Sequence, residues 1–539
     1  MLEFRNDLRR YLDGEVIHAR PAGMGTRLRK YAKRNPLIVA TAGMAFFFVI
    51  AWLGYGLLFA YPAILHERDQ ARNERNKTVA AEELKQEQLK RIRRLSDLKM
   101  LDELKSRETR LWPALPEMAS AMKTWLRDAG ALISRLDLHR ATLDSLLAET
   151  GRDPAEAGGG FTPDPGRSMG DRPGQWYFEQ LNMLVAGIAS FEADENHIIQ
   201  NVRERLARAE SIERESIINY SAAWQQAIAS IADRNESPCY EGLLIDPVIG
   251  LVPLGRDAGS GLWEFAHVQT GEMARRGMDG ALQITGATGC VLVLIPGGTF
   301  TMGAGKLPPG STVQTYVNEV PAHEVTVQPF FLSKYEMTQG QWLYSTGSNP
   351  STLHPGVDEV GEYTLRHPVE NVSWDECNAT LFHLDLRFPS EAEWEYGARG
   401  GLNTIWAMGD QRESLEGAAN LCDQVYYRNS DPLPRLYDDW LNDGYLYHAP
   451  VGLFKPNLFG LHDVHGNVWE WCQDFYHLDY VGAPADGSAW ESPGMLERVY
   501  RGGGFDFPSQ YCKLTFRYKK VSHYKYLNMG IRPARSLGK

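Results

Sequence analysis

The chain has 539 residues, of which 43% are hydrophobic and 23% charged, an ordinary globular composition that excludes wholesale disorder. This length allows two or three domains. The formal net charge of −12 gives no reason to expect nucleic-acid binding, because proteins that bind nucleic acids usually present a basic face.

An uncharged segment lies near the N-terminus. Residues 36–65, PLIVATAGMAFFFVIAWLGYGLLFAYPAIL, exceed the roughly 20 residues that cross a bilayer core, and they predict one transmembrane helix. A buried soluble helix is the alternative. The preceding RLRKYAKRNP is basic, and Lys and Arg favour the cytoplasmic side. We therefore expect residues 1–35 to be cytoplasmic and residues 66–539 to lie outside the cytoplasm, in the periplasm if the cell is Gram-negative.

The region that follows has a helical pattern. Residues 66–150 are rich in Glu, Lys, Arg, Leu and Ala, which favour long helices. The Gly- and Pro-rich segment 151–176 interrupts them, and residues 177–235 resume the pattern. Apolar residues at three- and four-residue steps form a heptad-like seam: Leu181, Leu184, Ile188, Phe191, Ile198, Val202, Ala209 and Ile212. We expect a helical hairpin stalk that packs on itself; a sensory or dimerising coiled coil, hence a homodimer, is the alternative.

From residue 236 onward the composition changes to short β-rich runs separated by Gly, Pro and Asn turns. We take residues 236–290 as lead-in strands and residues 291–539 as the C-terminal domain. One helix is expected after Thr338 as its N-cap. A second is expected after Ser390, where Glu393 completes a capping box and Gly400 or Gly401 ends the helix. The predicted fold class is α+β.

Seven motifs occur in order over residues 291–537: IPGGTFTMG, HEVTVQPFFLSKYEMTQGQW, PVENVSWDEC, RFPSEAEWEYGARGG, GLHDVHGNVWEWCQD, RVYRGGGF and LNMGIRPARS. Together they closely resemble the formylglycine-generating enzyme, or sulfatase-modifying factor, family. The resemblance implies a variant of the C-type lectin fold. The family includes sulfatase-activating oxidases, members without known chemistry, and variable proteins of diversity-generating retroelements, so the fold does not fix the function.

Two further segments resemble bacterial membrane proteins that fuse a serine/threonine kinase to this domain. LIDPVIGLVPLGRDAGSGLWEFAHVQTGE is similar to their lead-in, and residues 1–35 are similar to the tail of the kinase. A plain basic anchor is the alternative for residues 1–35. The sequence contains no Gly-rich loop, HRD or DFG segment. We therefore expect the chain to correspond to the kinase-less part of such a fusion and to phosphorylate nothing.

The resemblance also implies structural calcium, which tolerates six to eight oxygen ligands on irregular backbone. One set of ligands would combine two acidic side chains with two carbonyls: Asp463, Gly466, Val468 and Glu470. The second would combine an amide, an acid and two carbonyls: Asn420, Leu421, Asp443 and Tyr445. The alternative is that Asp463 and Glu470 only cap turns and pair with Arg or with Trp N–H groups.

Catalysis in this family is implied to need two cysteines near the C-terminal GG motif, which bind copper(I) as thiolates. Phe507 stands at the first of these positions, Cys512 at the second, and Gly504 replaces the usual serine. We therefore expect no copper and a catalytically degenerate domain. Cys512 would be a disulfide partner or a small buried residue, since six cysteines permit disulfides outside the cytoplasm. The alternative is an enzyme, a formylglycine-generating oxidase or a related activity, that uses Cys512.

The segment FDFPSQYCKLTFRYKKVSHYKYLN, residues 505–528, interleaves aromatic, basic and small polar residues, as recognition surfaces do. In the family's fold it lines the ligand groove. The candidate ligand-binding residues are Phe505, Asp506, Phe507, Ser509, Tyr511, Tyr518, His523, Tyr524, Tyr526 and Asn528. We expect a ligand-recognition or sensing protein whose partner outside the cytoplasm is a protein or a glycan. The retroelement variable protein is the remaining alternative.

Overall fold

The computed structural model describes residues 60–150, 172–193, 197–309, 313–357, 362–430, 436–492 and 494–538, with a few single positions besides. The chain divides into two compact units, residues 1–96 and 97–539. Most of the predicted transmembrane segment, residues 36–59, and most of the kinase-tail-like segment 1–35 lie outside the described residues. Within the described ranges, no helix combines the length and the apolar character needed to cross a membrane. The transmembrane helix therefore stays a prediction.

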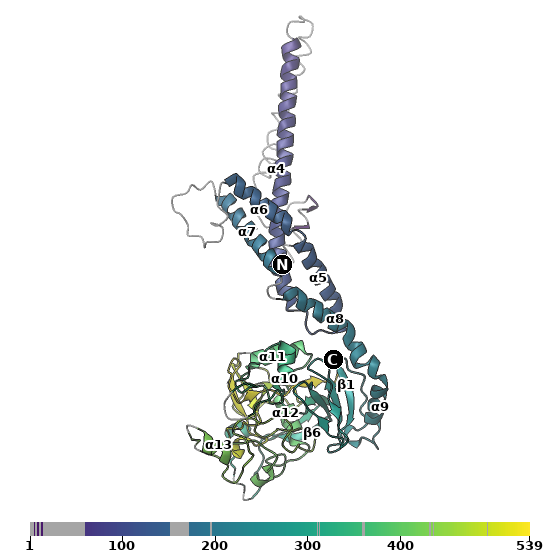
Figure 1. Cartoon of the computed structure of the whole chain (residues 1–539), viewed down its shortest axis with the longest axis vertical. Helices are drawn as coiled ribbons and strands as arrows, with labels where there is room; N and C mark the ends of the chain where they lie inside the picture. The colour runs from purple at the N-terminus through teal and green to yellow at the C-terminus, as the bar shows by residue number, and fades with distance from the viewer. Residues whose placement is uncertain are drawn as a thin grey trace. The chain divides into compact units, whose positions relative to one another are not determined.

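Helices account for most of the described residues before position 233. They are α4 (Ala60–Glu108), α5 (Ala119–Ile133), α6 (Leu136–Thr150), α7 (Arg172–Ala193), α8 (Ile198–Ser216) and α9 (Ser221–Ala232). In the unit 97–539, the end of α4 packs with α5 to α8 around a core that includes Leu104, Trp125 and Ile188 (Figure 1). Most of the predicted seam, from Leu181 to Ala209, is buried in this core. The heptad-like pattern thus packs within one chain. We call residues 97–232 the helical module.

The larger sheet of the C-terminal domain has five antiparallel strands in the order β1-β2-β5-β8-β13. The strands are β1 (Leu251–Arg256), β2 (Trp263–His267), β5 (Val291–Ile295), β8 (Phe330–Ser333) and β13 (Ala534–Ser536). Every residue of β5 is buried, as the uninterrupted run VLVLI predicts. Trp224 and Ile231 of α9 join the same core. Residues 236–290 therefore supply two strands of the domain's own sheet.

The second sheet has the order β11-β10-β9-β12. It is built from β9 (Trp469–Phe475), β10 (Glu497–Arg501), β11 (Tyr518–Val521) and β12 (Met529–Gly530), with β12 parallel to β9. Two small hairpins complete the strands: β3 (Arg275–Arg276) with β4 (Leu282–Gln283), and β6 (Gly298–Met302) with β7 (His323–Val327). The mixture of helices and sheets confirms the α+β class for the C-terminal domain.

Short helices surround these sheets (Figure 1). The two predicted ones are confirmed: α10 (Gln339–Thr346) has Thr338 as its N-cap, and α12 (Glu391–Arg399) has the Ser390 capping box and ends at Gly400. The helices α11 (Trp374–His383) and α13 (Gln424–Asn429) were not predicted. The remaining turns of 3-10 helix are η1 (Pro116–Met118), η4 (Ile218–Tyr220), η5 (Pro238–Tyr240), η6 (Val317–Glu319), η7 (Arg412–Leu415) and η8 (Ser509–Tyr511).

Helix α11 contacts both the 505–528 segment and the helical module. In its first turn, Glu376 forms an ion pair with Lys525. At its last residue, the His383 ring stacks on Trp112 with ring centroids 4.1 Å apart. The guanidinium of Arg205 also lies over Trp112, 4.4 Å from the ring centroid. One short helix thus connects a loop of the candidate ligand segment to an aromatic contact of the helical module.

Candidate functional site

The two positions at which the family resemblance implies copper-binding cysteines hold Phe507 and Cys512. The Phe507 ring packs edge-on against Trp469, with ring centroids 5.1 Å apart, and against Tyr511 at 6.0 Å. Cys512 is fully buried, and burial raises the pKa of its thiol well above the usual value. A Cβ at Gly503 would lie 2.0 Å from Cys512 Sγ, so the backbone closes directly over the thiol. The two residues therefore do not fit a two-thiolate copper site.

The six cysteines form no disulfide. All six thiols are free, and each except Cys239 is buried. Of the two roles predicted for Cys512, the structure shows the small buried residue and not the disulfide partner.

Asp506 lies next to Phe507 and is half-buried. Its two carboxylate oxygens accept hydrogen bonds from Asn528 Nδ2 at 2.8 and 3.0 Å. Burial raises the pKa of this carboxyl to about 6. A Cβ at Gly504 would lie 3.0 Å from Asp506 Oδ1 and 3.2 Å from the Trp469 indole. The glycine that replaces the family's serine therefore leaves room for the Asp506 carboxylate.

The charge of this carboxylate acts on three tyrosines. The pKa values of Tyr426, Tyr500 and Tyr524 are raised, first by burial and then by neighbouring groups that include Asp506. These three hydroxyls therefore stay protonated close to the carboxylate. Tyr518 and Tyr526 are 46% and 47% exposed. We call this surface the Asp506 face; it consists of Asp506, Phe507, Tyr511, Tyr518, Tyr524 and Tyr526, with Tyr426 from outside the segment. The buried Trp469 and Tyr500 support it through ring contacts with Phe507 and Tyr518.

Other predicted ligand residues lie elsewhere. Phe505 is 1% exposed, with its ring against Tyr426 and Tyr447 at centroid distances of 6.0 and 5.5 Å. Ser509 is buried, and its hydroxyl donates to Asp438 Oδ1 at 2.9 Å. Asn528 is buried and only its amide reaches the face, whereas His523 is exposed.

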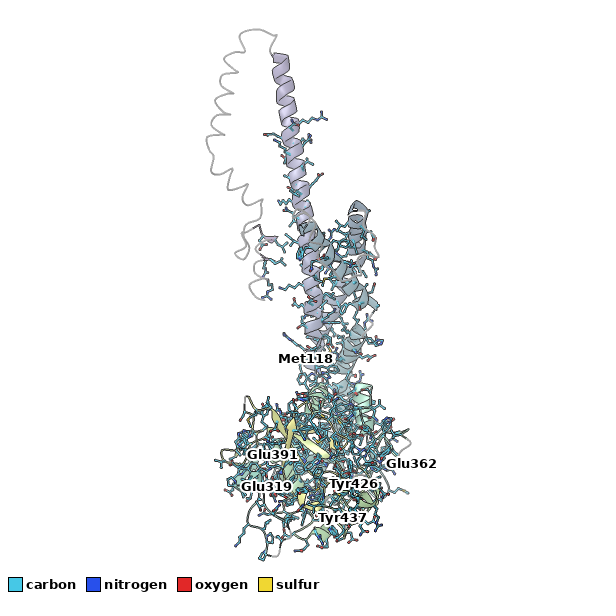
Figure 2. All side chains as sticks on the ribbon, turned by 90° about the vertical axis from the view of Figure 1, so that its left-hand side faces the viewer. Met118, Glu319, Glu362, Glu391, Tyr426 and Tyr437 are labelled. Atoms are coloured by element: carbon cyan, nitrogen blue, oxygen red, sulfur yellow. The ribbon has the colours of Figure 1, made fainter. Side chains whose placement is uncertain are left out.

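Sequence reasoning missed Tyr426 as a member of the face, and Trp469 and Tyr500 as the residues that support it. Trp469 and Tyr500 stand inside two of the quoted motifs, so the motifs contained the signal. Tyr426 comes from α13, which no pattern predicted; Figure 2 labels it in the C-terminal domain.

Basic residues of the same segment point inward. Lys513 Nζ lies 2.9 Å from both oxygens of Glu319, and Lys513 and Glu319 are 2% and 0% exposed. Arg517 binds Glu391 through two nitrogens, at 2.7 and 2.5 Å. Glu319 and Glu391 lie inside the domain (Figure 2). The segment therefore alternates between a solvent-facing aromatic surface and buried ion pairs.

One cavity of about 910 Å³ lies apart from the predicted ligand residues. It is lined by residues of η1, by Leu244–Ile249 and by the end of the chain around Arg535. Arg535 is already paired with Asp385, and none of the ten candidate ligand residues lines the cavity. We therefore place the candidate site at the Asp506 face.

The first predicted calcium set is partly occupied by protein groups. Arg532 donates to Glu470 Oε1 at 2.6 Å and to Oε2 at 2.9 Å, and Trp394 Nε1 donates to Oε2 at 2.6 Å. Both oxygens of Glu470 are thus satisfied, as the alternative interpretation expected. Asp463 Oδ2 accepts from the Gly452 N–H at 2.8 Å, while Oδ1 is buried without a hydrogen-bond partner. Only Asp463 keeps a side-chain oxygen that fits a cation.

The second predicted set likewise keeps one side-chain oxygen that fits a cation. Asn420 Oδ1 is buried and has no hydrogen-bond partner. Asp443 accepts from the N–H groups of Leu421 at 2.8 Å and Tyr445 at 2.9 Å, so the four predicted positions lie together. Burial, and then Asp423, raises the pKa of Asp443 to about 7. Among the described residues, no group of three or more His, Cys, Asp or Glu side chains is placed to hold a metal. Calcium at either set stays a prediction.

Comparison with known proteins gives the family. Residues 285–537 match the FGE-sulfatase model, described as the sulfatase-modifying factor enzyme 1-like domain. The formylglycine-generating enzymes of Streptomyces coelicolor and Thermomonospora curvata are 30% and 29% identical; the matches cover 41% of this chain and 80% and 84% of those enzymes. The serine/threonine-protein kinase pkn1 of Chlamydia pneumoniae is 27% identical, over 39% of this chain and 32% of the kinase.

Among solved structures, PvdO from Pseudomonas aeruginosa is 28% identical with a TM-score of 0.38, covering 49% of this chain and 98% of PvdO. The family match and the curated relatives confirm the resemblance seen in the seven motifs, and the match to pkn1 agrees with the resemblance to kinase fusions. The chain therefore belongs to the sulfatase-modifying factor family of the formylglycine-generating enzymes, through a domain that its model matches over residues 285–537.

Proposed function

We propose that the C-terminal domain recognises a ligand, as a binding or sensing module, and does not make formylglycine. One observation carries the proposal. Where active relatives are expected to place a thiolate pair, this chain has the Phe507 ring packed on Trp469 and a single thiol, Cys512, closed off by the Gly503 backbone. Copper(I) needs accessible soft ligands, and one buried, protonated thiol does not provide them.

The surroundings of the domain complete the proposal. The uncharged segment 36–65 anchors the chain in a membrane with its N-terminus in the cytoplasm, and the C-terminal domain meets its partner, a protein or a glycan, on the other side. The helical module lies between the membrane segment and the C-terminal domain in the sequence. The proposal also includes a homodimer that forms through the helical module. Topology is tested by a reporter fused after Lys539, which should be active only outside the cytoplasm. Activity in the cytoplasm would contradict the orientation.

The test of the lost chemistry uses the purified full chain and a Cys-x-Pro-x-Arg peptide, with and without added copper. We expect no formylglycine by mass spectrometry, under conditions in which the Streptomyces coelicolor enzyme converts the peptide. The variant Phe507→Cys tests whether the missing second thiol is the reason that copper does not bind. It supplies the second thiol, so it should gain copper(I) binding over the wild-type chain in a competition assay, even if the peptide stays unmodified.

A formylglycine-generating oxidase is the second candidate, because relatives with that name are about 30% identical to this chain over most of their length. Copper-dependent formylglycine that is abolished by Cys512→Ser would establish it and refute the recognition proposal.

A further inference from the structure

The Asp506 carboxylate has no positively charged partner. Among the residues that the structure describes, no Lys or Arg forms an ion pair with Asp506, and two hydrogen bonds reach its carboxylate from the neutral Asn528 amide. The basic residues close to it in the sequence are engaged elsewhere: Lys519 pairs with Glu497, and Lys525 pairs with Glu376. A half-buried carboxylate without a counter-charge loses part of its hydration, and a cationic ligand would compensate that loss.

The groups around Asp506 suit a cation that carries carbon. Tyr426, Tyr500 and Tyr524 lie close enough for its charge to act on their hydroxyls. Aromatic ring faces attract ammonium groups within about 6 Å of the centroid. One such contact is present within the chain, since Lys520 Nζ lies 4.4 Å from the centroid of the Tyr524 ring. The exposed Tyr518 and Tyr526 rings add further surface of the same kind.

The backbone at Gly504 is buried and packs closely beside the Asp506 carboxylate, with no room for a side chain. Any larger residue at position 504 would place its Cβ 3.0 Å from Asp506 Oδ1 and 3.2 Å from Trp469. The glycine therefore keeps a carboxylate oxygen and an indole edge next to each other. An anion would be repelled by Asp506, and a neutral ligand would leave its charge uncompensated.

We propose that the Asp506 face binds an organic ammonium group, with the Asp506 carboxylate as counter-charge and the solvent-accessible tyrosine rings of the face as cation–π partners. This rests on the proposed function, because it names the chemical class of the ligand that the recognition module takes. The ammonium group belongs either to a small amine or to a lysine side chain of a protein, and both present the same charge to the face.

The probe is choline, compared with its neutral isostere 3,3-dimethylbutan-1-ol. Both are titrated into the purified full chain at pH 7.5, where a carboxyl with a pKa of about 6 is ionised, and binding is followed by saturation-transfer NMR. We expect choline to bind about 10-fold more tightly than the isostere, a ratio that cation–π contacts and one counter-charge account for. A second pair, N-acetyl-lysine methylamide and N-acetyl-norleucine methylamide, tests the lysine source in the same way.

Two variants change the affinity in opposite directions. Asp506→Asn keeps an oxygen for the Asn528 amide but removes the charge, so the choline preference should fall to about 1. Lys520→Met removes the internal ammonium from Tyr524 and a like charge from the face, so choline should bind a few-fold more tightly. The matched control is Asp486→Asn, an exposed aspartate on a different loop, which should leave both affinities unchanged.

Equal binding of choline and the isostere, or an unchanged preference in a folded Asp506→Asn variant, overturns the ammonium proposal. Neither result bears on formylglycine formation, so the recognition module would survive with a different ligand class. Conversely, copper-dependent formation of formylglycine would refute the recognition proposal, whether or not choline binds. A preference for the lysine derivative over choline supports a protein partner, and the reverse supports a small amine.

Discussion

Two buried ion pairs of the C-terminal domain and the Asp506 face differ in how a carboxylate is neutralised. In the interior, Glu319 meets the Lys513 ammonium and Glu391 meets the Arg517 guanidinium, with all four groups nearly inaccessible to solvent. At the face, Asp506 meets only the Asn528 amide and a set of tyrosines. Both kinds of contact come from one segment, residues 505–528. The comparison separates residues that hold the fold from a carboxylate that remains available to a ligand.

The largest effect should come from removing an interior cation. Lys513→Met leaves Glu319 buried without a positive partner, and breaking one side of a buried pair costs about 3–5 kcal/mol in the free energy of unfolding. Scanning calorimetry of the full chain should show a much lower melting temperature for the C-terminal domain. The control Lys519→Met breaks a pair whose side chains are 38% and 41% exposed, and it should cost less than about 1 kcal/mol.

The double variant Lys513→Met/Glu319→Gln tests whether the unpaired Glu319 charge causes the loss of stability in Lys513→Met. Removing the orphaned charge as well should recover a large part of the lost stability, because the desolvation penalty disappears with it. A double variant no more stable than Lys513→Met would show that Lys513 acts through packing, not charge, and would weaken the comparison.

Glu370 is one of several interior carboxyl groups without a cation, and it extends the comparison. It is fully buried, accepts the Leu353 N–H at 2.7 Å through Oε1, and its Oε2 has no hydrogen-bond partner. Burial raises its pKa from 4.5 to about 7. A carboxyl with a raised folded-state pKa gives stability that is present below its unfolded pKa and lost as the pH rises through 7.

The expected pH dependence is therefore a fall in stability between about pH 4.5 and 7.5, of about 2–3 kcal/mol from this group. Glu370→Gln keeps an oxygen for the Leu353 N–H and cannot ionise, so its stability should fall less over this range. Unfolding of both proteins by urea at several pH values measures the difference. Parallel curves for the two proteins would show that Glu370 ionises without cost in the fold.

Calcium should have a smaller effect. A ligand bound only by the folded state stabilises it by about 2.7 kcal/mol at a concentration 100-fold above its dissociation constant. We expect a chelator to lower the melting temperature of a calcium-loaded sample by a few degrees, and Asp443→Asn to remove most of that response. The opposite outcome is that Glu470→Gln removes the response to the chelator and Asp443→Asn does not. It would show that calcium binds at the Glu470 set, despite the contacts of Glu470 with Arg532.

The smallest effect on stability is expected at the face itself. Asp506→Asn removes a charge that no cation balances within the described chain and keeps an acceptor for Asn528, so the free energy of unfolding should change by less than about 0.5 kcal/mol. A large loss of stability in this variant would place Asp506 among the residues that hold the fold, and the distinction drawn above would fail.

Local signals in the sequence were enough for part of the fold. The Thr338 N-cap and the Ser390 capping box concern residues three positions apart, so the sequence shows both partners together. The same signal at Ser373 and Glu376, which opens α11, was present but overlooked. The family motifs, read in order, predicted the domain that the family match confirms.

The ion pairs and the Asp506 face could not be predicted in this way. Lys513 and Glu319 are 194 positions apart, and no local pattern connects them. Interleaved basic and aromatic residues suggested one mixed surface, whereas the fold buries Lys513 and Arg517 and exposes Tyr518 and Tyr526. Phe505 and Ser509 were predicted on the face for the same reason. Which side of the segment faces solvent depends on long-range packing.

Helix α11 gives the face a mechanical connection to the rest of the chain. Its ten residues span about 15 Å, and a helix is stiff over that length. Lys525 and Tyr526 are consecutive, so a ligand that moves Tyr526 also displaces the residue bound to Glu376 in the first turn of α11. At the other end of the same helix, the His383 ring stacks on Trp112. A shift at the binding surface would therefore reach the helical module through an exposed ion pair, one short helix and an aromatic contact.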